Sequence, residues 1–299
     1  MKRILAVVLV LMLAPVAVVG QDAIEKTDNT RYGGTTAQFL TFPAEARGAA
    51  LGGSYSALVS DVSSMHWNPA GLALLPATQA LFSYTPYLAD TRSIWAGIGM
   101  PLRGGEWGLG VSFSNFGFGE QLVYTEANQE GTGETYSVSE SAIGATLALQ
   151  FSDRFSAGFT GKVILQQFAQ LEGTGFAFDF GTSYHTELAG RPIRASFIMR
   201  NYGGDISVSG PELNTQVPPV DGGMGVDPTP AVLRTASFGL PTEFRVGIAY
   251  DVLAGESQRI TLLSEFSQPT DTDPGFSVAA EYGLRLLTGV SAQLRGSFA

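Results

Sequence analysis

Hydrophobic and polar residues alternate in short segments along most of the chain after residue 77. In residues 106–116, Trp107, Leu109, Val111 and Phe113 take every second position, and most residues between them are glycine or serine. Successive side chains of a β-strand point to opposite faces, so the alternation predicts two-faced strands. Eleven such segments can be traced, over residues 78–84, 93–102, 106–116, 143–151, 155–165, 176–184, 193–200, 244–251, 260–266, 276–285 and 290–298.

The connections between these segments favour a membrane barrel over a soluble sandwich, whose strands would alternate in the same way. Short and long connections mostly take turns: residues 103–105 and 152–154 are short, whereas 117–135 and 203–243 are long. Outer-membrane barrels have short turns on the periplasmic rim and longer loops on the outer rim. The connection predicted at residues 171–174 is the one misfit, because it is short where a long loop is expected.

Charged residues in the predicted strands fall on the side that carries glycine and serine, and the opposite side is almost free of charge. A basic side chain that faces the middle of a bilayer costs about 2–4 kcal/mol, so we expect the charged side to face the lumen. These charges form either a selective pathway or mutually neutralising pairs, and the presence of both signs favours pairs. The expected lumen-facing charges are Lys162, Asp179, Arg194, Arg200, Arg245, Glu265, Glu281, Arg285 and Arg295.

The composition agrees with strands in a membrane. The chain has 37 glycines and 19 phenylalanines among 299 residues, and only 15% of its residues are charged. After the amino terminus no apolar run reaches the roughly 18 residues of a membrane-spanning helix, so strands must cross any bilayer. The absence of cysteine rules out disulfides and thiolate metal ligands, and the formal net charge of −10 argues against a nucleic-acid partner.

The amino terminus has the organisation of a cleaved secretory signal peptide. Lys2 and Arg3 precede an apolar run over residues 4–19, and Gly20 precedes the polar Gln21. Loss of residues 1–20 would remove these two positive charges and change the net charge from −10 to −12. We therefore expect export to the outer membrane of a diderm bacterium, with a signal peptide over 1–20, a leader over 21–37, a non-alternating segment over 38–77 and a barrel over 78–299.

The non-alternating segment is rich in alanine, glycine and serine, and it has a turn signal at Asn68 and Pro69. Its residues alone leave two interpretations open. The segment is either a plug of short helices inside the lumen, or a periplasmic lid or loosely ordered leader. Its distinctive residues are Ala46, Arg47, Gly48, Gly52, Gly53, Asp61, Trp67, Asn68, Pro69, Ala70, Gly71 and Leu72.

In this order, behind a signal peptide and ahead of a barrel, these residues resemble the amino-terminal signature of the PorV/PorQ family, a branch of the FadL-like outer-membrane barrels. The resemblance implies an all-β, transmembrane antiparallel barrel of fourteen strands whose amino-terminal helical segment plugs the lumen. The chain departs from that pattern, because about eleven strands are present. It also stops inside an alternating segment at Phe298 and Ala299, so we expect about three further strands in the native product.

Residues that suggest other chemistry have simpler explanations. His66 and His185 are the only histidines, which is too few for a three-histidine metal site, and His66 beside Trp67 is interpreted as a packed plug residue. Asp179, Ser183 and His185 share a strand face, but we expect their spacing to be too wide for a hydrogen-bonded catalytic relay. We therefore expect no catalytic, cofactor-binding or metal-binding residues and no enzymatic activity.

Three functions remain open. The resemblance implies a type IX secretion component that handles exported cargo by its carboxyl-terminal domain, with secretion-system proteins and outer-membrane lipid as further partners. The second hypothesis is a FadL-like transporter of hydrophobic small molecules, with Leu72, Leu74 and Leu75 at the border of a pocket, and the third is a barrel that only anchors or gates neighbouring proteins. The connection 203–240 is either a recognition element or a disordered excursion, and Asp271 and Asp273 are interpreted as solvated loop charges.

Overall fold

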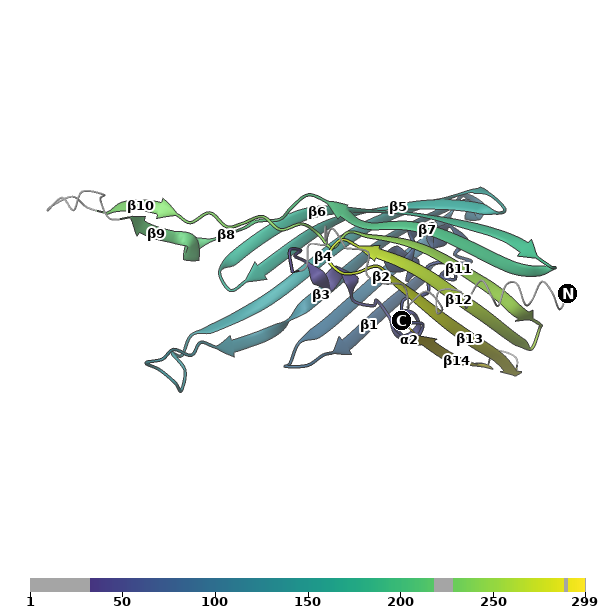
Figure 1. Cartoon of the computed structure of the whole chain (residues 1–299), viewed down its shortest axis with the longest axis horizontal. Helices are drawn as coiled ribbons and strands as arrows, with labels where there is room; N and C mark the ends of the chain where they lie inside the picture. Colours follow the sequence, from purple (N-terminus) through teal and green to yellow (C-terminus); the bar gives the residue numbers. More distant parts are fainter. Residues whose placement is uncertain (1–32, 218–227, 288–289, 299) are drawn as a thin grey trace, which may run out of the picture.

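The computed structural model describes residues 33–217, 228–287 and 290–298, and its main element is one curved antiparallel sheet (Figure 1). Eleven strands of this sheet follow one another in chain order, each paired with the next, and the described pairings include none between the first and the last. Each predicted segment overlaps a different one of these wall strands, so the prediction of eleven strands is confirmed. They are β1 (Gln79–Pro86), β2 (Arg92–Leu102), β3 (Trp107–Leu122), β4 (Thr135–Ser152), β5 (Phe155–Phe168), β6 (Leu171–Leu188), β7 (Arg191–Gly203), β11 (Glu243–Ala254), β12 (Gln258–Pro269), β13 (Gly275–Leu287) and β14 (Val290–Phe298).

Several wall strands are longer than the alternation predicted. β3 continues to Leu122 and β4 begins at Thr135, so part of the predicted loop 117–135 is strand. The prediction of a connection at residues 171–174 was wrong, because these residues begin β6 and only Ala169 and Gln170 separate β5 from β6. The extra strand residues are mostly polar. A search for alternating hydrophobic positions does not detect strand segments that carry few hydrophobic residues.

The two rims of the sheet differ. We call the rim that carries the β3–β4, β5–β6 and β7–β11 connections the loop rim, and the opposite rim the turn rim. On the turn rim, two residues separate β4 from β5 and two separate β6 from β7, and a 3-10 turn, η4 (Arg103–Gly105), joins β2 to β3. The predicted alternation of short and long connections therefore holds, apart from the tight β5–β6 turn.

The connection between β7 and β11 carries its own strands. β8 (Val208–Ser209) pairs with β6, and after the turn η5 (Pro211–Leu213) the strand β9 (Asn214–Val217) pairs with β10 (Thr229–Val232). The β9–β10 hairpin extends away from the wall at the loop rim (Figure 1). The interpretation of this connection as a disordered excursion does not fit its described part, and residues 218–227 lie outside the described residues.

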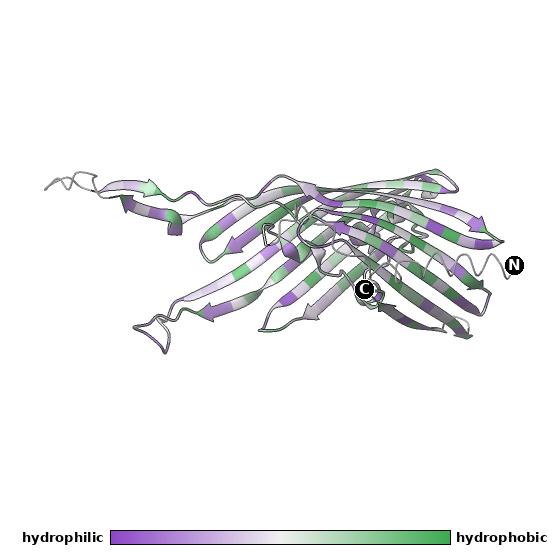
Figure 2. Cartoon of the chain, in the orientation of Figure 1, coloured by the Kyte–Doolittle hydropathy of each residue, from purple (hydrophilic) through white to green (hydrophobic). Residues whose placement is uncertain are grey.

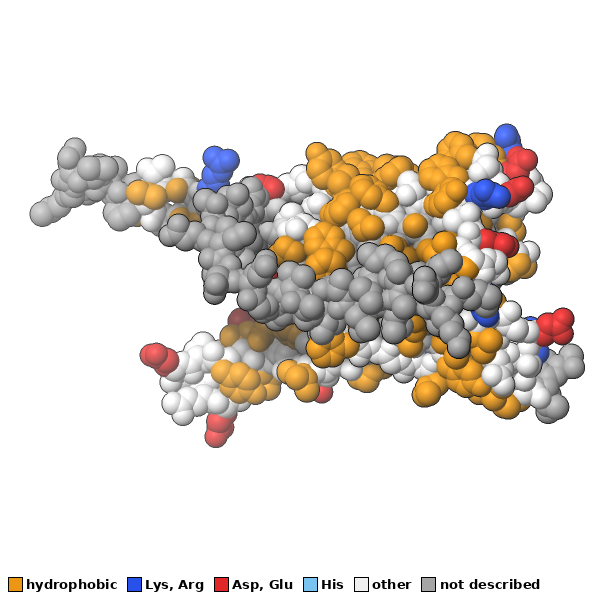
Figure 3. Space-filling view, turned by 45° about the vertical axis from the view of Figure 1, so that its right-hand side comes forward, with side chains coloured by type: hydrophobic (Ala, Val, Ile, Leu, Met, Phe, Trp, Pro, Cys, Tyr) orange, Lys and Arg blue, Asp and Glu red, His pale blue; other side chains and the backbone are white. Residues whose placement is uncertain are grey.

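The outward face of the wall is apolar. Phe82, Ile143, Phe159 and Phe176 alternate with inward-facing positions and are exposed, as are many other large apolar side chains. Figure 2 shows the alternation of hydropathy along the strands, and in Figure 3 hydrophobic side chains gather over the middle of the visible face while charged ones lie nearer its ends. This distribution is that of a wall in contact with lipid. Among the described residues, none of the helices has the length and apolar character to span a bilayer.

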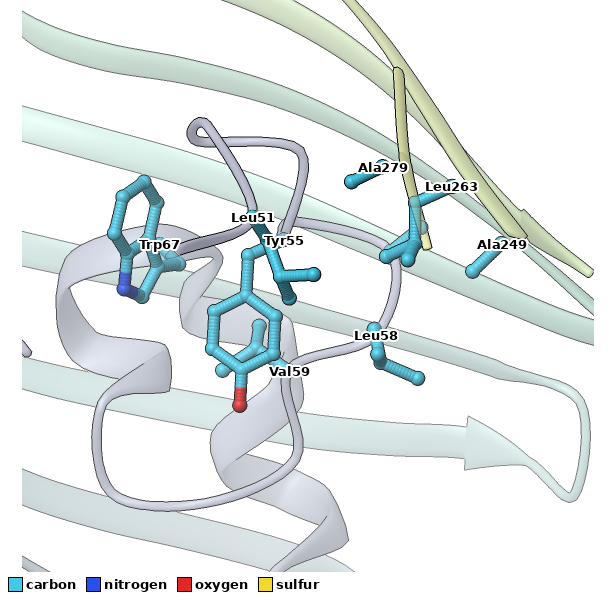
Figure 4. Close-up of a cluster of buried hydrophobic side chains, with 9 residues drawn as sticks. Leu51, Tyr55, Leu58, Val59, Trp67, Ala249, Leu263 and Ala279 are labelled. Carbon is cyan, nitrogen blue, oxygen red and sulfur yellow. The ribbon is translucent and has the colours of Figure 1, made fainter. Parts of the chain in front are cut away.

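Residues 34–75 fold inside the curve of the sheet, and we call them the plug. Their elements are η2 (Gln38–Thr41), α2 (Ala46–Ala50), α3 (Ser64–Trp67) and η3 (Pro69–Leu74). Figure 4 shows plug residues such as Leu51 and Tyr55, both fully buried, beside Ala249 and Leu263 of the wall. The interpretation as an internal plug of short helices is therefore confirmed, and that of a periplasmic lid was wrong.

Candidate functional site

The two halves of the plug motif form one contact around the start of α2. The carboxylate of Glu45 accepts hydrogen bonds from the backbone N–H of Gly48 at 2.8 Å and from Nε1 of Trp67 at 2.9 Å. The indole lies so close to Gly48 that a Cβ atom there would be 2.2 Å from Cζ2 of Trp67. Burial raises the pKa of the Glu45 carboxyl. Glycine at position 48 is thus required by the packing of Trp67.

Arg47 joins the plug to the wall. Its guanidinium donates to the two carboxylate oxygens of Glu281 on β13 at 2.8 and 2.9 Å, and to the hydroxyl of Tyr55 at 2.9 Å. Such two-point pairing of arginine with a carboxylate is both stronger and more directional than a single hydrogen bond. Asp61 lies 3.8 Å from Arg47 and also accepts from the backbone N–H of Ser63 at the start of α3. The motif residues Arg47 and Asp61 therefore position the plug helices against the wall.

The turn η3 lies in a groove that four wall strands share. Gly108, Ala148, Gly158 and Gly181 stand opposite one another on β3, β4, β5 and β6, and their row faces inward. A Cβ atom on Gly108 would be 2.3 Å from the carbonyl oxygen of Leu72. We call these four residues the glycine row. The absence of bulky side chains in the row is what allows the plug backbone to reach the wall.

Asn68 fixes the start of η3. Its side-chain NH₂ donates to the carbonyl oxygens of Ser56 in the plug at 3.0 Å and of Thr182 on β6 at 3.1 Å, while its Oδ1 accepts from the backbone N–H of Ala70. Ser156 on β5 donates to the carbonyl oxygen of Ala70 at 3.2 Å. Asn68, Ser56 and Ser156 are buried, and these bonds satisfy their polar groups, as burial of polar atoms requires. The motif from Asn68 to Leu72 is therefore one of the parts of the plug that are bonded to the wall.

Eight of the nine predicted lumen charges form ion pairs within the described residues, and the ninth, Arg285, is exposed. The pairing supports mutual neutralisation over a selective pathway. The nearest N–O distances are 2.7 Å for Lys162–Asp179, 2.9 Å for Arg194–Asp251, 3.5 Å for Arg200–Glu243, 2.8 Å for Arg245–Glu243, 2.9 Å for Arg245–Glu265 and 2.7 Å for Arg295–Glu281.

Besides Glu281, three of these wall charges bond the plug directly. Glu265 accepts from the hydroxyl of Ser56 at 2.6 Å, Arg245 donates to the carbonyl oxygen of Gly53 at 3.1 Å, and Arg200 donates to that of Leu40 at 3.0 Å. Gly53 has a φ of +79°, in the left-handed region that favours glycine. The polar lumen is therefore a set of plug contacts as well as a set of neutralised pairs.

A β-bulge brings two consecutive residues of β7 into this network. The β6–β7 register shifts between Phe178 and Phe180, and Asn201 has a φ of 54°. Both Arg200 and Asn201 are buried as a result, and Asp179 accepts from the backbone N–H of Asn201 at 2.8 Å. Bulges redirect side chains in this way where a strand must present an extra residue.

His66 lies between the plug and the buried cations. Its Nε2 is 3.3 Å from Nη2 of Arg200, and its ring packs edge-on against Trp67 at a centroid distance of 4.9 Å. Removal from water and the nearby charges of Arg200, Lys162 and Arg245 hold the pKa of the His66 imidazole well below its ordinary value. The neutral ring can then accept a hydrogen bond from Arg200.

This lowered pKa predicts that plug docking weakens in acid. A released plug would bind a proton at His66 near pH 6.5, whereas the docked plug would not, so docking loses free energy as the pH falls below about 6.5. The chain has no cysteine, so Ala73→Cys, at a position 2% exposed, gives a single thiol that reports release. We expect its maleimide labelling, normalised to the unfolded chain at each pH, to rise from about pH 8 to about pH 5.

The raised pKa of Glu45 acts in the opposite direction, so the histidine is isolated by comparison with His66→Gln, which keeps a neutral acceptor. That variant is expected to lose most of the rise in labelling. An unchanged pH profile in His66→Gln would show that the imidazole does not carry the effect.

Two interpretations of single residues need correction. Ser183 and His185 are not too far apart, since Oγ and Nε2 are 2.9 Å from each other, but Asp179 pairs with Lys162 and does not contact His185 in the described structure. Asp271 is buried and accepts from Thr35 at 2.7 Å, so it is a contact of the plug and not a solvated loop charge. Within the described residues no group of three potential metal ligands is present.

The plug leaves little space against strands β2 to β5. The cavity between the plug and strands β2 to β5, lined by residues such as Phe39, Met65, Trp95 and Lys162, has a volume of about 30 Å³. A water molecule needs roughly 10–15 Å³, so the cavity has room for about two waters. A larger hollow of about 520 Å³, bordered by Leu74 and Leu75, opens at the turn rim.

A family model described as "Type IX secretion system protein PorV" matches residues 25–208. The chain belongs to the PorV family. The match includes the whole plug motif, so the resemblance drawn from those residues is confirmed. Members of the PorV family are outer-membrane barrel proteins, and this PorV-family chain is therefore an outer-membrane barrel protein.

Solved structures show the same fold at low sequence identity. The toluene transporter TodX of Pseudomonas putida has a TM-score of 0.50 at 12% identity, over 84% of this chain and 82% of that chain. The monoaromatic hydrocarbon channel CymD (TM-score 0.44, 10% identity, 86% and 92% covered) and a Pseudomonas aeruginosa FadL homologue (0.39, 9%, 84% and 88%) are less similar. No curated protein matches the chain. The likeness to TodX shows a FadL-like barrel fold for the PorV-family chain and nothing of its ligand.

The glycine row is the part of the site that the sequence interpretation missed. Gly108, Gly158 and Gly181 were expected on the lumen side, but only as small residues among polar ones. Their signal was present in the sequence as glycine at one inward position of β3, β5 and β6. It becomes a groove only when the strand register places the three positions opposite one another.

Proposed function

We propose that the protein is a sealed outer-membrane barrel of the type IX secretion machinery that holds exported cargo at its loop rim, through the described parts of the β7–β11 connection. The observation that carries the proposal is the combination of PorV-family membership with a plug that is hydrogen-bonded to the wall and leaves little space against strands β2 to β5. A barrel sealed in this way offers binding surfaces at its rim and no route for a folded chain. The β9–β10 hairpin, with Val217, Val232 and Leu233 exposed, is the most extended of those surfaces.

A single cysteine on the hairpin tests the proposal. Thr215→Cys is expected to crosslink to the carboxyl-terminal domains of secreted cargo in intact cells, because β9 extends from the loop rim. Asp153→Cys, exposed in the β4–β5 turn on the opposite rim, is the matched control and is expected to give no crosslink. Undiminished secretion of cargo after deletion of residues 214–232 would contradict the proposal. This deletion leaves the contacts of Ile206 and Gly239 with the rest of the fold in place.

The proposal includes cleavage of residues 1–20 on export and the absence of enzymatic activity. Transport of hydrophobic molecules, the second hypothesis, would require the plug to leave the glycine row, because the cavity between the plug and strands β2 to β5 has room for only about two waters. An uptake experiment distinguishes the two functions. The uptake of an apolar probe is measured with and without an introduced disulfide that holds the plug to the wall. Uptake that the disulfide abolishes would favour the transporter.

A further inference from the structure

The outward face of β3 to β6 changes character toward the loop rim. Phe113, Ile143, Val163 and Phe176 stand opposite one another on the four strands and form an exposed apolar row. Two residues further along each strand, the corresponding outward row is Asn115, Ser141, Leu165 and Thr174. The next row contains Gly117, Ser139, Gln167 and Glu172. The border between the apolar row and the polar rows therefore marks the level where hydrocarbon gives way to lipid headgroups.

The polar rows are organised by Asn115. Its side-chain nitrogen donates to the hydroxyl oxygens of Ser139 and Ser141, both at 2.9 Å. A serine hydroxyl that accepts from Asn115 keeps its own hydrogen for another acceptor. Two O–H donors are thus available on the outward face, directly above the apolar row.

A hollow of about 320 Å³ lies over these residues. We call it the headgroup hollow; the outward side chains that line it are Ser139, Ser141, Leu165, Gln167, Glu172 and Thr174. Its volume lies at the lower end of the roughly 300–1,000 Å³ of small-molecule sites. None of its lining residues is basic, and Glu172 adds a negative charge, so the hollow disfavours phosphate and other anions.

We propose that the headgroup hollow binds the uncharged, hydroxyl-rich head of an outer-leaflet amphiphile whose acyl chain lies on the row of Phe113, Ile143, Val163 and Phe176. Ligand oxygens accept from Ser139 and Ser141, and ligand hydroxyls donate to Gln167 and Glu172. A sugar-like head has both donors and acceptors, which is the combination that these side chains complement. The apolar row directly below requires the head to be attached to a hydrocarbon tail.

Native mass spectrometry of the full chain in micelles of an octyl tetraethylene glycol ether tests the proposal with three added probes. Dodecyl maltoside is expected to remain bound as one adduct. Dodecyl phosphate, with the same tail and an anionic head, is expected to be retained about tenfold less, which corresponds to about 1.4 kcal/mol. Free maltose, which lacks the tail, is expected not to bind. Retention of dodecyl phosphate equal to that of the maltoside, or binding of maltose that displaces the maltoside, overturns the proposal.

The double variant Ser141→Leu with Gln167→Leu removes hydrogen-bonding groups from the hollow and is expected to lower maltoside retention about tenfold, as for one or two lost neutral hydrogen bonds. Thr182→Leu is the matched control, because Thr182 faces outward on β6 beyond the hollow, and it is expected to keep the adduct. Both variants are first tested for folding. A folded barrel migrates differently on a gel before and after heating, and only variants that show this difference are compared. An unchanged adduct in the double variant, or an equal loss in Thr182→Leu, overturns the assignment.

Discussion

Replacement of Gly158 by valine is expected to release the plug from the wall without removing a single charged or hydrogen-bonding group. A Cβ atom at this position would be 2.4 Å from the carbonyl carbon of Pro69 and 2.6 Å from the backbone nitrogen of Ala70. These are backbone atoms of η3, held by Asn68, so they cannot move aside as the end of a flexible side chain could. Overpacking of a tight contact costs about 1–3 kcal/mol, and a clash with backbone lies at the upper end of that range.

In the Ala73→Cys background, Gly158→Val is expected to raise maleimide labelling by about 5- to 150-fold, the factor to which 1–3 kcal/mol corresponds. Gly161→Val on the same strand is the matched control. Gly161 faces outward, and the nearest atom to a Cβ there is Cε1 of Phe178 at 3.9 Å, so labelling should stay at the level of the parent. Continued protection of the introduced thiol in Gly158→Val would show that η3 does not depend on the glycine row.

The wall could be predicted from the sequence because its physical cause is local. Trp107, Leu109, Val111 and Phe113 face lipid along one strand, and the alternation is visible without knowledge of any neighbour. The same holds for Lys162, Asp179 and Glu265, since a charge on the glycine-bearing side of a strand can only face the lumen when the other side faces hydrocarbon. Position on a face was therefore predictable, whereas the identity of the partner across the lumen was not.

What could not be predicted depends on register between distant segments. The contact of Gly158 with Pro69 joins residues far apart in sequence, and it exists only because η3 crosses four strands at the level of the glycine row. The bulge at Asn201 was missed for a related reason. In β7 two consecutive residues, Arg200 and Asn201, are both buried, which breaks the two-residue period of the strand. The sequence of β7 alone does not show this break, because it results from a shift in the pairing with β6.

The second large effect is expected from Asp179→Asn, which removes one charge from the buried pair at this bulge. Nζ of Lys162 is 2.7 Å from Asp179 and 2.7 Å from Oδ1 of Asn201, and the side chains of Lys162 and Asp179 are 11% and 1% exposed. Removal of one partner from a buried pair leaves an uncompensated charge and costs about 3–5 kcal/mol. We expect a loss of this size in the free energy of unfolding, measured by denaturant titration of the barrel in lipid vesicles.

A double-mutant cycle separates the charge from the bulge. Asparagine at 179 keeps an oxygen that can accept from the backbone N–H of Asn201, the bond that Asp179 makes at 2.8 Å, so the bulge itself keeps its partner. Lys162→Met then removes the unpaired ammonium while retaining much of its apolar length, and the pair of substitutions is expected to recover most of the stability that Asp179→Asn loses. If the two losses instead add, the ion pair is not what stabilises the bulge. In that case Arg200, which the bulge brings within 3.0 Å of the plug carbonyl of Leu40, is positioned by the backbone alone.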